Sequence, residues 1–185
     1  MHVISTSSAA PFTAADVAVI LRERGWLVPA SGPVCESSAN SALDAWLARA
    51  AELLGPQAAD RAALASLLSL VFTYDARALL ADGANQAVLA REGTREVIRE
   101  LANRVLDGGT LDSDRFKEIV EGMKSAVAYR SRAMFHPIRL ALAGRAGEGE
   151  LDRVILLLDA AAALDFAMPV KGARQRMLEF CAALD

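Results

Sequence analysis

The sequence is poor in aromatic residues, cysteine and histidine, and each shortage argues against a class of protein. Aromatic side chains make up 5% of the 185 residues, which weakens any function that needs a stacking platform for single-stranded bases. The two cysteines, Cys35 and Cys181, are far apart, and the histidines, His2 and His136, are isolated. Because there is no CxxC pair or Cys/His cluster, we expect no metal site.

Long apolar runs and strand patterns are also missing. The longest strongly apolar stretch, Val154 to Leu164, is interrupted by Asp159 and is too short to cross a bilayer. The first residues show no basic segment followed by an apolar run, so no secretory signal is visible. β-branched and aromatic residues rarely alternate with polar ones. We therefore expect a cytoplasmic protein with reduced thiols and no membrane partner.

What the sequence does contain favours helices. Hydrophobic residues make up 54% of the chain, and its commonest residues, Ala, Leu, Arg and Glu, are good helix formers. This composition can bury a core, so global disorder is not expected. The predicted fold class is all-α, an irregular bundle of many helices with short connections and no repeat of solenoid period.

The first half divides at clusters of Gly, Pro and Ser. Thr13 and Asp16 have the spacing of a capping box, and Gly25 is a natural helix stop. Residues 26–40 read as a loop or hinge. Further helices are expected from Ser41 to Gly55 and from Asp60 to about Leu80. We therefore divide the chain into an N-terminal helical segment, 1–57, and a helical region, 58–185; the sequence leaves open whether the two pack together.

The second half shows similar helix boundaries. Asp82-Gly83 marks a break, Pro137 suits the first turn of a helix, and Gly144 suits its end. Residues 125–136 form a less regular basic stretch. The expected helices are a short one ending at Arg91, then 94–106, one capped by Thr110 or Asp112, then 138–143, and an apolar helix over 154–167. A last, amphipathic helix over 174–184 carries Met177, Leu178, Cys181 and Leu184 as its apolar residues.

No group of residues has the pattern of a catalytic site. The turn from Gly144 to Gly149 lacks the Gly-Lys-Ser/Thr ending of a phosphate loop and does not follow a strand. Asp112 and Asp114 are two residues apart at a helix start, where they suit the positive helix end better than acid–base work. His136 has no evident orienting partner or nucleophile. We predict no enzyme, no catalytic residue and no cofactor.

Charge is segregated in one part of the chain. The formal net charge of −3 argues against electrostatic attraction of the molecule as a whole to nucleic acid. No DNA partner is expected. Between Glu121 and Glu148, however, 26 residues contain no acid and five cations, so this stretch carries +5 and the remainder −8. The cations could bind an anion or an RNA backbone, or could pair with acids on neighbouring helices. The five are Lys124, Arg130, Arg132, Arg139 and Arg145.

The same stretch resembles a known family. Phe135-His-Pro-Ile-Arg-Leu-Ala-Leu-Ala-Gly144, then Gly147-Glu-Gly-Glu-Leu151, then the apolar Val154 to Leu158, is similar to the C-terminal anticodon-binding region of bacterial glutamyl-tRNA synthetases, which are class I enzymes. The resemblance extends over about residues 58–168. Ala143 stands where the family usually has Thr, and Gly149 where it has Pro.

The resemblance implies a helical, cage-like fold and a tRNA partner. It places Pro137 at a helix start, Arg139 as a polar anchor and Gly144 at the helix end. The two ATP-handling motifs of class I synthetases are absent, so the chain resembles a freestanding anticodon-binding region without the catalytic body.

Two hypotheses follow. The first is a non-catalytic module that binds RNA, most plausibly tRNA, through a local basic patch. The second is a protein-interaction or regulatory module that kept the fold and lost RNA binding, which the acidic remainder and the few aromatic residues favour. An unrecognised small enzyme has no support from residue spacing. The predicted RNA-binding residues are Lys124, Tyr129, Arg130, Arg132, Phe135, Arg139 and Arg145.

Overall fold

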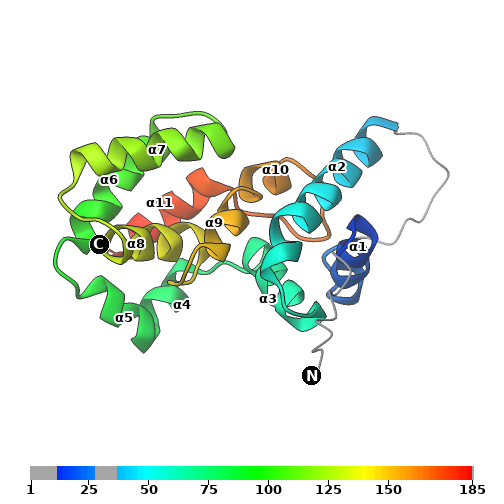
Figure 1. The fold of residues 1–185 in the computed structure, drawn as a ribbon, viewed down its shortest axis with the longest axis horizontal. Helices are drawn as coiled ribbons and strands as arrows, with labels where there is room; N and C mark the ends of the chain where they lie inside the picture. The colour runs from blue at the N-terminus through cyan, green and yellow to red at the C-terminus, as the bar shows by residue number, and fades with distance from the viewer. Residues whose placement is uncertain (1–11, 28–36, 185) are drawn as a thin grey trace, which may run out of the picture.

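The computed structural model describes residues 12–27 and 37–184, and every regular element in these two ranges is helical (Figure 1). This confirms the predicted all-α fold. None of the helices in the described ranges is long and apolar enough to cross a membrane. The elements are α1 (Ala14–Glu23), α2 (Ser37–Leu54), η1 (Gly55–Gln57), α3 (Arg61–Phe72), α4 (Ala76–Ala81), α5 (Gly83–Leu89), α6 (Thr94–Leu106), α7 (Ser113–Ala126), α8 (Arg132–Ala143), α9 (Glu150–Ile155), α10 (Leu158–Ala162) and α11 (Ala173–Leu184).

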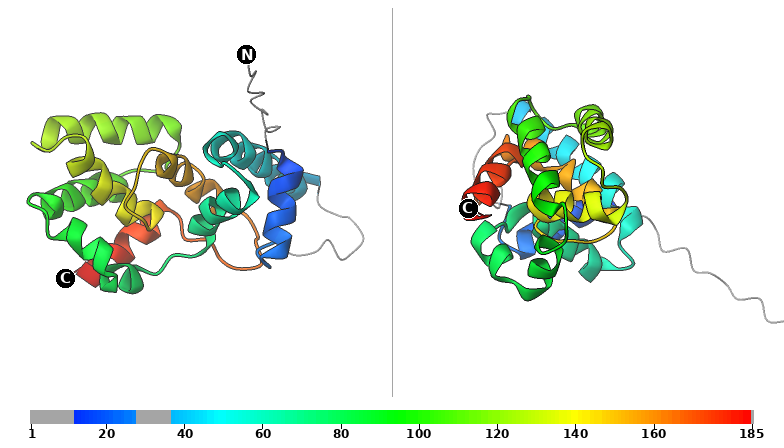
Figure 2. Two further views of the ribbon diagram at one scale, coloured as in Figure 1. Left: turned by 60° about the horizontal axis from the view of Figure 1, so that its bottom comes forward. Right: turned by 90° about the vertical axis from the view of Figure 1, so that its left-hand side faces the viewer.

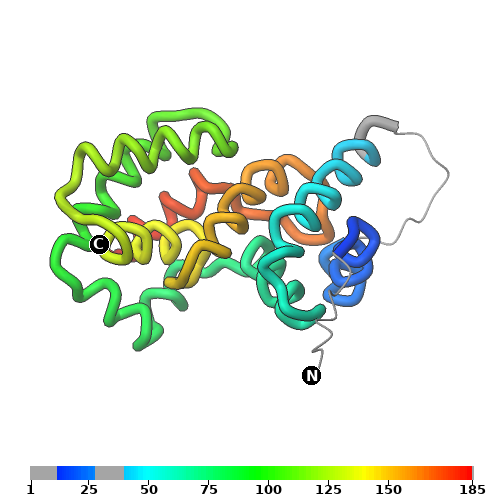
Figure 3. The backbone as a smooth tube through the Cα atoms, in the orientation of Figure 1, coloured from blue at the N-terminus to red at the C-terminus, as the bar shows by residue number. Residues whose placement is uncertain are grey.

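The molecule is elongated, with α1 to α3 at one end and α4 to α8 at the other (Figures 1 and 2). Aromatic rings fill the first end. Trp26 stacks on Phe72 with ring centroids 4.7 Å apart, and Phe166 meets Phe72 edge-on at 4.9 Å. Residues 163–172, orange in Figure 3, run toward α1 and α2 before returning to α11. This excursion supplies Phe166 to the aromatic cluster.

The N-terminal helices pack against the rest of the chain. The Trp46 indole Nε1 donates a hydrogen bond to the Leu157 carbonyl at 3.2 Å, and the Ala167 amide donates to the Trp26 carbonyl at 2.9 Å. The buried hydrophobic core is therefore continuous across residue 57. The division of the chain at that position stays a prediction.

At the second end, α8 lies at the centre and contacts α5, α6, α9 and α11. All its residues from Pro137 to Ala143 are buried. Its two ends are marked by positive φ angles, 49° at Ser131 and 80° at Gly144. Glycine accepts this conformation without the steric cost that a β-carbon brings, so Gly144 is well suited to ending the helix, as predicted.

A fully buried arginine, Arg176, connects α11 to two other helices. Its guanidinium donates to the carbonyls of Val71 at 2.6 Å, Leu142 at 2.8 Å and Lys171 at 2.8 Å. The Val71 and Leu142 carbonyls lie in the last turns of α3 and α8, where no intrahelical donor remains for them. The ring of Tyr74 lies 4.6 Å from the guanidinium carbon, and its hydroxyl donates to the Ala141 carbonyl at 2.6 Å. We call Arg176 and Tyr74 the polar centre.

Most predicted helix starts are confirmed by their capping contacts. Thr13 and Asp16 form the capping box of α1, and Asp60, Asp82 and Asp112 accept backbone N–H groups at the starts of α3, α5 and α7. Two predictions in this half were wrong. The second helix begins at Ser37, so residues 37–40 of the loop expected over 26–40 are helical. Residues 28–36 of that expected loop lie outside the described residues. The helix expected to reach Leu80 ends at Phe72, because Asp75 caps a separate α4.

Three further predictions in the second half need correction. Helix α8 begins at Arg132, so Pro137 lies inside it rather than in its first turn; proline removes only one intrahelical hydrogen bond there, and the buried Met134 and Pro137 favour the earlier start. The apolar helix expected over 154–167 is divided into α9 and α10. Leu178 is 50% exposed, because α11 turns Arg176 and Phe180 inward instead.

Candidate nucleic-acid interface

The predicted basic stretch packs against the loop between α5 and α6. The Tyr129 ring lies directly on Gly93, so closely that a β-carbon at this position would overlap it. Gly93 also has a φ of 78°, which favours glycine a second time. Farther along, Arg91 Nη1 lies 3.3 Å from His136 Nδ1. The fold therefore adds Arg91 and Arg95, on either side of Gly93, to the cations identified from the sequence.

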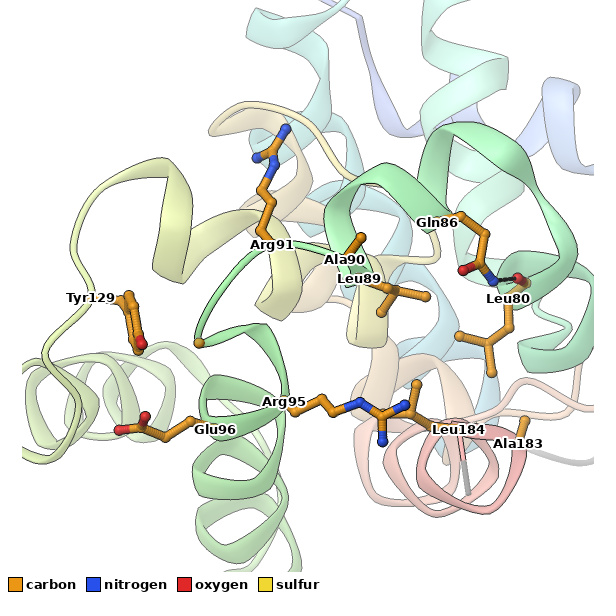
Figure 4. A pocket seen from close by; sticks show the side chains of 11 residues that line it. Leu80, Gln86, Leu89, Ala90, Arg91, Arg95, Glu96, Tyr129, Ala183 and Leu184 are labelled. Atoms are coloured by element: carbon orange, nitrogen blue, oxygen red, sulfur yellow. Dashed lines mark hydrogen bonds between the residues drawn. The ribbon is translucent and has the colours of Figure 1, made fainter.

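A first hollow of about 730 Å³ lies beside Tyr129, and we call it the Tyr129 hollow (Figure 4). Arg95 extends across it toward Leu184, while the Arg91 side chain points upward in this view, away from Arg95. Glu96 also borders this hollow, near Tyr129. The hollow thus has the Tyr129 ring on one side and the Arg95 side chain, from the first turn of α6, on another.

A second hollow of about 1010 Å³, the Arg145 hollow, is lined by His136 of α8 and by Gly144 and Arg145 at the end of that helix, and shares Arg91 with the first. Its polar rim includes Arg91, His136, Arg145 and Lys171. Lys171 is already ion-paired, since its Nζ lies 2.6 Å from the carboxylate of Glu179, and it also donates to the Tyr74 carbonyl at 3.1 Å. The apolar lining includes Leu79, Val88, Ala146 and Met168.

Three of the five predicted cations are ion-paired. Lys124 lies 2.6 Å from Glu121 and Arg132 lies 2.9 Å from Glu148. Arg139 is 6% exposed and binds both carboxylate oxygens of Asp152, at 2.7 and 2.8 Å, as well as the Gly147 carbonyl at 2.7 Å. Arg139 therefore fixes the turn between α8 and α9, which agrees with the polar anchor that the family resemblance implies.

The other predicted site residues occupy different surroundings. Arg130 is folded back onto the Val127 and Tyr129 carbonyls, at 2.5 and 2.8 Å. Phe135 is half-buried, with the Arg139 guanidinium 5.0 Å from its ring. Arg145 is exposed and makes no ion pair with any residue of the described ranges. The structure brings Tyr129 and Arg145 to the two hollows; RNA contact by all seven residues stays a prediction.

The two ring nitrogens of His136 have different surroundings. Its Nδ1 faces Arg91, and its Nε2 is buried without a hydrogen-bond partner in the described part of the chain. Burial, and secondarily the positive charge of Arg91, lower the pKa of the imidazole from its ordinary value of 6.5. His136 is therefore neutral at pH 7 and adds no positive charge to the rim.

Sequence reasoning missed Arg91 and Arg95 because each is followed by a glutamate, Glu92 and Glu96, so the local charge sums to zero. Counting charge along the chain cannot separate side chains that the fold directs to different sides. It also missed Arg176, which was expected only as part of an amphipathic helix. Within the described residues, no group of three His, Cys, Asp or Glu side chains is placed to hold a metal ion.

The fold and this surface define an all-helical domain without a nucleotide-binding α/β body in its described part. Comparison with known families identifies it further: residues 16–164 match the anticodon binding domain model, and the chain belongs to that family. The matched range begins within α1 and crosses residue 57. The predicted resemblance is thus confirmed, and it extends farther toward the N-terminus than residue 58.

A glutamate–tRNA ligase 2 of Syntrophus aciditrophicus (strain SB) is 26% identical over 113 residues. The alignment covers 61% of this chain and 23% of that relative. No solved structure matches the chain.

Proposed function

We propose that the chain is a non-catalytic module that binds tRNA through the surface around the two hollows. Membership of the anticodon-binding family supports a tRNA partner. The contact residues proposed from the structure are Arg91, Arg95, Tyr129, Arg130, Arg132 and Arg145. Lys124, at the end of α7, and Phe135, beneath Arg139, remain secondary candidates.

The observation that carries this proposal is the position of Arg91 and Arg145. Both line the Arg145 hollow, and neither forms an ion pair within the described residues. Unpaired guanidinium groups at the rim of a hollow suit backbone phosphates, which position an RNA strand. Tyr129, half-buried beside the neighbouring hollow, adds an aromatic surface of the kind on which unpaired RNA bases stack.

The ion pair of Arg132 is compatible with this role. The Arg132 and Glu148 side chains are 75% and 61% exposed, and exposed pairs contribute only about 0–1 kcal/mol. A phosphate can therefore replace Glu148 at little cost. Arg139 differs, because its bidentate pair with Asp152 is largely buried and holds the α8–α9 turn. In this proposal Arg139 supports the surface without touching RNA.

The alternative is a protein-interaction module that kept the fold and lost RNA binding. It is favoured by the pairing of Lys124, Arg132 and Arg139 with acids, since arginines engaged in ion pairs provide less free positive surface. The two functions differ in their response to salt. Phosphate contacts release counterions and weaken steeply as salt rises, whereas an apolar protein interface is much less sensitive.

The test is a fluorescence-anisotropy titration of the full chain with total tRNA at low and physiological salt. We expect saturable binding that weakens with salt. Arg91→Ala/Arg145→Ala should weaken it further and reduce the slope of log affinity against log salt by about 1–2, since each lost phosphate contact removes roughly 0.7–0.9. No saturable binding at low salt would refute the proposal.

The matched control is Arg22→Ala/Arg24→Ala. It removes the same charge from α1 and the residue after it, at the opposite end of the molecule (Figure 1). This variant should retain nearly all of the affinity and the salt slope. An equal loss in both variants would mean that net charge, rather than the proposed surface, governs binding.

A further inference from the structure

A narrow groove of about 180 Å³ lies between α6 and α11, and we call it the α6–α11 groove. The two helices are antiparallel. Arg95, in the first turn of α6, and Leu184, in the last turn of α11, line the same groove, and at the other end the Arg174 side chain donates to the Leu106 carbonyl. From Arg95 to Leu106 is about 16 Å at 1.5 Å per residue, so the pair can support a partner helix of three turns.

The floor and one wall of this groove are apolar. Ile98 and Ala102 of α6 are buried at its base, and Cys181 and Leu184 of α11 are half-buried beside them. Leu178, three residues before Cys181 on α11, is 50% exposed. Apolar surface that is gathered at a groove, rather than scattered singly, is typical of a contact with another molecule.

The apolar surface continues beyond the groove (Figure 4). Leu184 and Arg95 line both the α6–α11 groove and the Tyr129 hollow. Within that hollow, the half-buried Leu80 and Leu89 lie on the side away from Tyr129, as Leu184 does. Side chains of four helices therefore extend the apolar surface on both sides of Leu184.

The other wall of the groove is positive. Arg95 and Arg99 are four residues apart on α6, and both are exposed. Neither forms an ion pair or a hydrogen bond with another residue of ranges 12–27 and 37–184. The acids of the same helix lie elsewhere, since Glu100 is 2.6 Å from Arg104 and Glu96 borders the neighbouring hollow. Among the described residues that line the groove none is acidic, so a negatively charged partner suits it.

We infer that the α6–α11 groove docks an acidic amphipathic helix of a partner protein. One apolar side chain of that helix enters the groove, and carboxylates on its flank meet Arg95 and Arg99. Apolar anchors at three- and four-residue spacing, with complementary charge beside them, are how a helix binds a groove of this kind. An RNA strand suits it less, because the described residues of the lining include no aromatic ring on which a base could stack.

The sequence provides no such helix outside the described ranges. Residues 1–11, 28–36 and 185 contain two acids in all, Glu36 and Asp185, and no run that combines acids with apolar residues at helical spacing. The occupant therefore comes from another protein. The inference is independent of the proposed function, because Arg99 and Leu178 belong to no surface assigned to RNA.

The test titrates the ¹⁵N-labelled full chain with a synthetic helical peptide that carries leucines at i, i+3, i+4 and i+7 and glutamates beside them. We expect saturable shifts of amide resonances in α6 and α11. Arg99→Glu should weaken binding about three- to tenfold, because repulsion replaces an exposed ion pair. The same peptide with lysines in place of its glutamates should bind the unmodified chain weakly and gain affinity in Arg99→Glu.

A second variant tests the apolar contact without changing charge. Leu178→Ala removes an exposed side chain and should leave the fold intact, so it serves even if Arg99→Glu disturbs α6. It should weaken the peptide about threefold or more and leave the affinity for tRNA unchanged. The matched control is Arg22→Glu, which makes the same charge change on α1 at the opposite end of the molecule (Figure 1) and should retain the peptide affinity.

The outcomes separate this site from the proposed function. Absence of saturable shifts up to millimolar peptide, or shifts centred outside α6 and α11, would overturn the docking site. Equal binding of a peptide with serines in place of its leucines would also overturn it, since charge alone would then explain binding. Dimerisation of the unmodified chain that Leu178→Ala abolishes would assign the groove to a second copy instead. Failure to bind tRNA would overturn only the proposed function.

Discussion

The two ends of the molecule are each organised around a buried centre, and the centres are built from opposite kinds of side chain. At the α1–α3 end, Phe72 contacts Trp26, Trp46 and Phe166. At the α4–α8 end, Arg176 and Tyr74 satisfy carbonyl groups of α3, α8 and the segment before α11. The free energy gained by packing the aromatic rings is roughly proportional to the apolar area that they bury. The stability of the polar centre depends instead on each hydrogen-bond donor lying close to a particular acceptor.

This difference bears on where the candidate site lies. The polar centre fixes the C-terminal end of α8 and the position of Lys171, and both border the Arg145 hollow. Tyr74 takes part in both the polar centre and the lining of the hollow. The aromatic centre mainly holds the N-terminal helices to the rest. Phe72 of the aromatic centre lines the hollow as well. We therefore expect damage to the aromatic centre to affect chiefly stability, and damage to the polar centre to affect both stability and the positions of the end of α8 and of Lys171.

The largest effect should come from Phe72→Ala. Phe72 is 4% exposed and lies at the middle of the ring cluster, so its truncation leaves a cavity and should lower the free energy of unfolding by about 3–5 kcal/mol. Urea unfolding followed by circular dichroism measures this. Truncation of Leu178, which is 50% exposed, is the control and should change stability by less than about 0.5 kcal/mol. A loss as small in Phe72→Ala would show that the aromatic centre does not stabilise the fold.

The second effect concerns Arg176→Met, which keeps a long apolar side chain but removes every donor. Each buried acceptor left without a donor costs about 1–3 kcal/mol, and three carbonyls lose theirs. Partial relaxation should limit the total loss to roughly 3 kcal/mol, below that of Phe72→Ala. Urea unfolding again gives the magnitude.

Amide hydrogen exchange measured on Arg176→Met tests whether Arg176 acts locally. Amide hydrogen exchange in α8 and residues 168–172 should accelerate in Arg176→Met, because the end of α8 loses its anchor, while exchange in α1 and α2 stays near that of the unmodified chain. Uniform acceleration along the whole chain in this variant would contradict a local positioning role for Arg176.

Sequence patterns predicted the elements whose causes are local. The capping side chains of Asp60 and Asp112, the break at Asp82-Gly83 and the helix stop at Gly144 all depend on neighbours within a few residues, and all were confirmed. One error also had a local cause, since Asp75, which caps α4, was overlooked. Other errors occurred where distant residues decide the conformation. At the break between α9 and α10, the Leu157 carbonyl accepts a hydrogen bond from the distant Trp46 indole at 3.2 Å. The carboxylate of Asp159, in α10, accepts the amides of Leu111 and Ala173, both at 2.6 Å.

The candidate site shows the same limit. Tyr129 and Arg145 were singled out from charge and aromatic content, and they do border the hollows. Arg91 and Arg95 were hidden by adjacent glutamates, and the ion pair between Arg132 and Glu148 depends on the path of the turn after α8. Which cations remain unpaired is a property of the tertiary structure, so a linear count of charge could not give it.

The smallest expected effect is a dependence of the free energy of unfolding on pH, caused by His136 at the rim of the candidate site. Its pKa in the folded protein lies below the unfolded value of 6.5, through burial and the nearby Arg91. Between these two pKa values the unfolded chain binds more protons than the folded one, so stability is full above pH 6.5 and falls as the pH drops toward the folded pKa. The groups around the ring are Arg91 from the α5–α6 loop, Glu148 from the turn after α8, and Arg132 and Arg139 from α8 itself.

His136→Gln removes this titration and keeps a polar side chain of similar reach. We expect the urea midpoint of the unmodified chain to fall more between pH 7 and pH 5 than that of His136→Gln, and the difference between the two proteins isolates the imidazole from the carboxylates that titrate in both. Arg91→Ala should shrink that difference, since it removes a positive charge that opposes protonation. A larger fall in His136→Gln than in the unmodified chain would mean that the folded state favours the charged imidazole, which the buried and unpartnered Nε2 argues against.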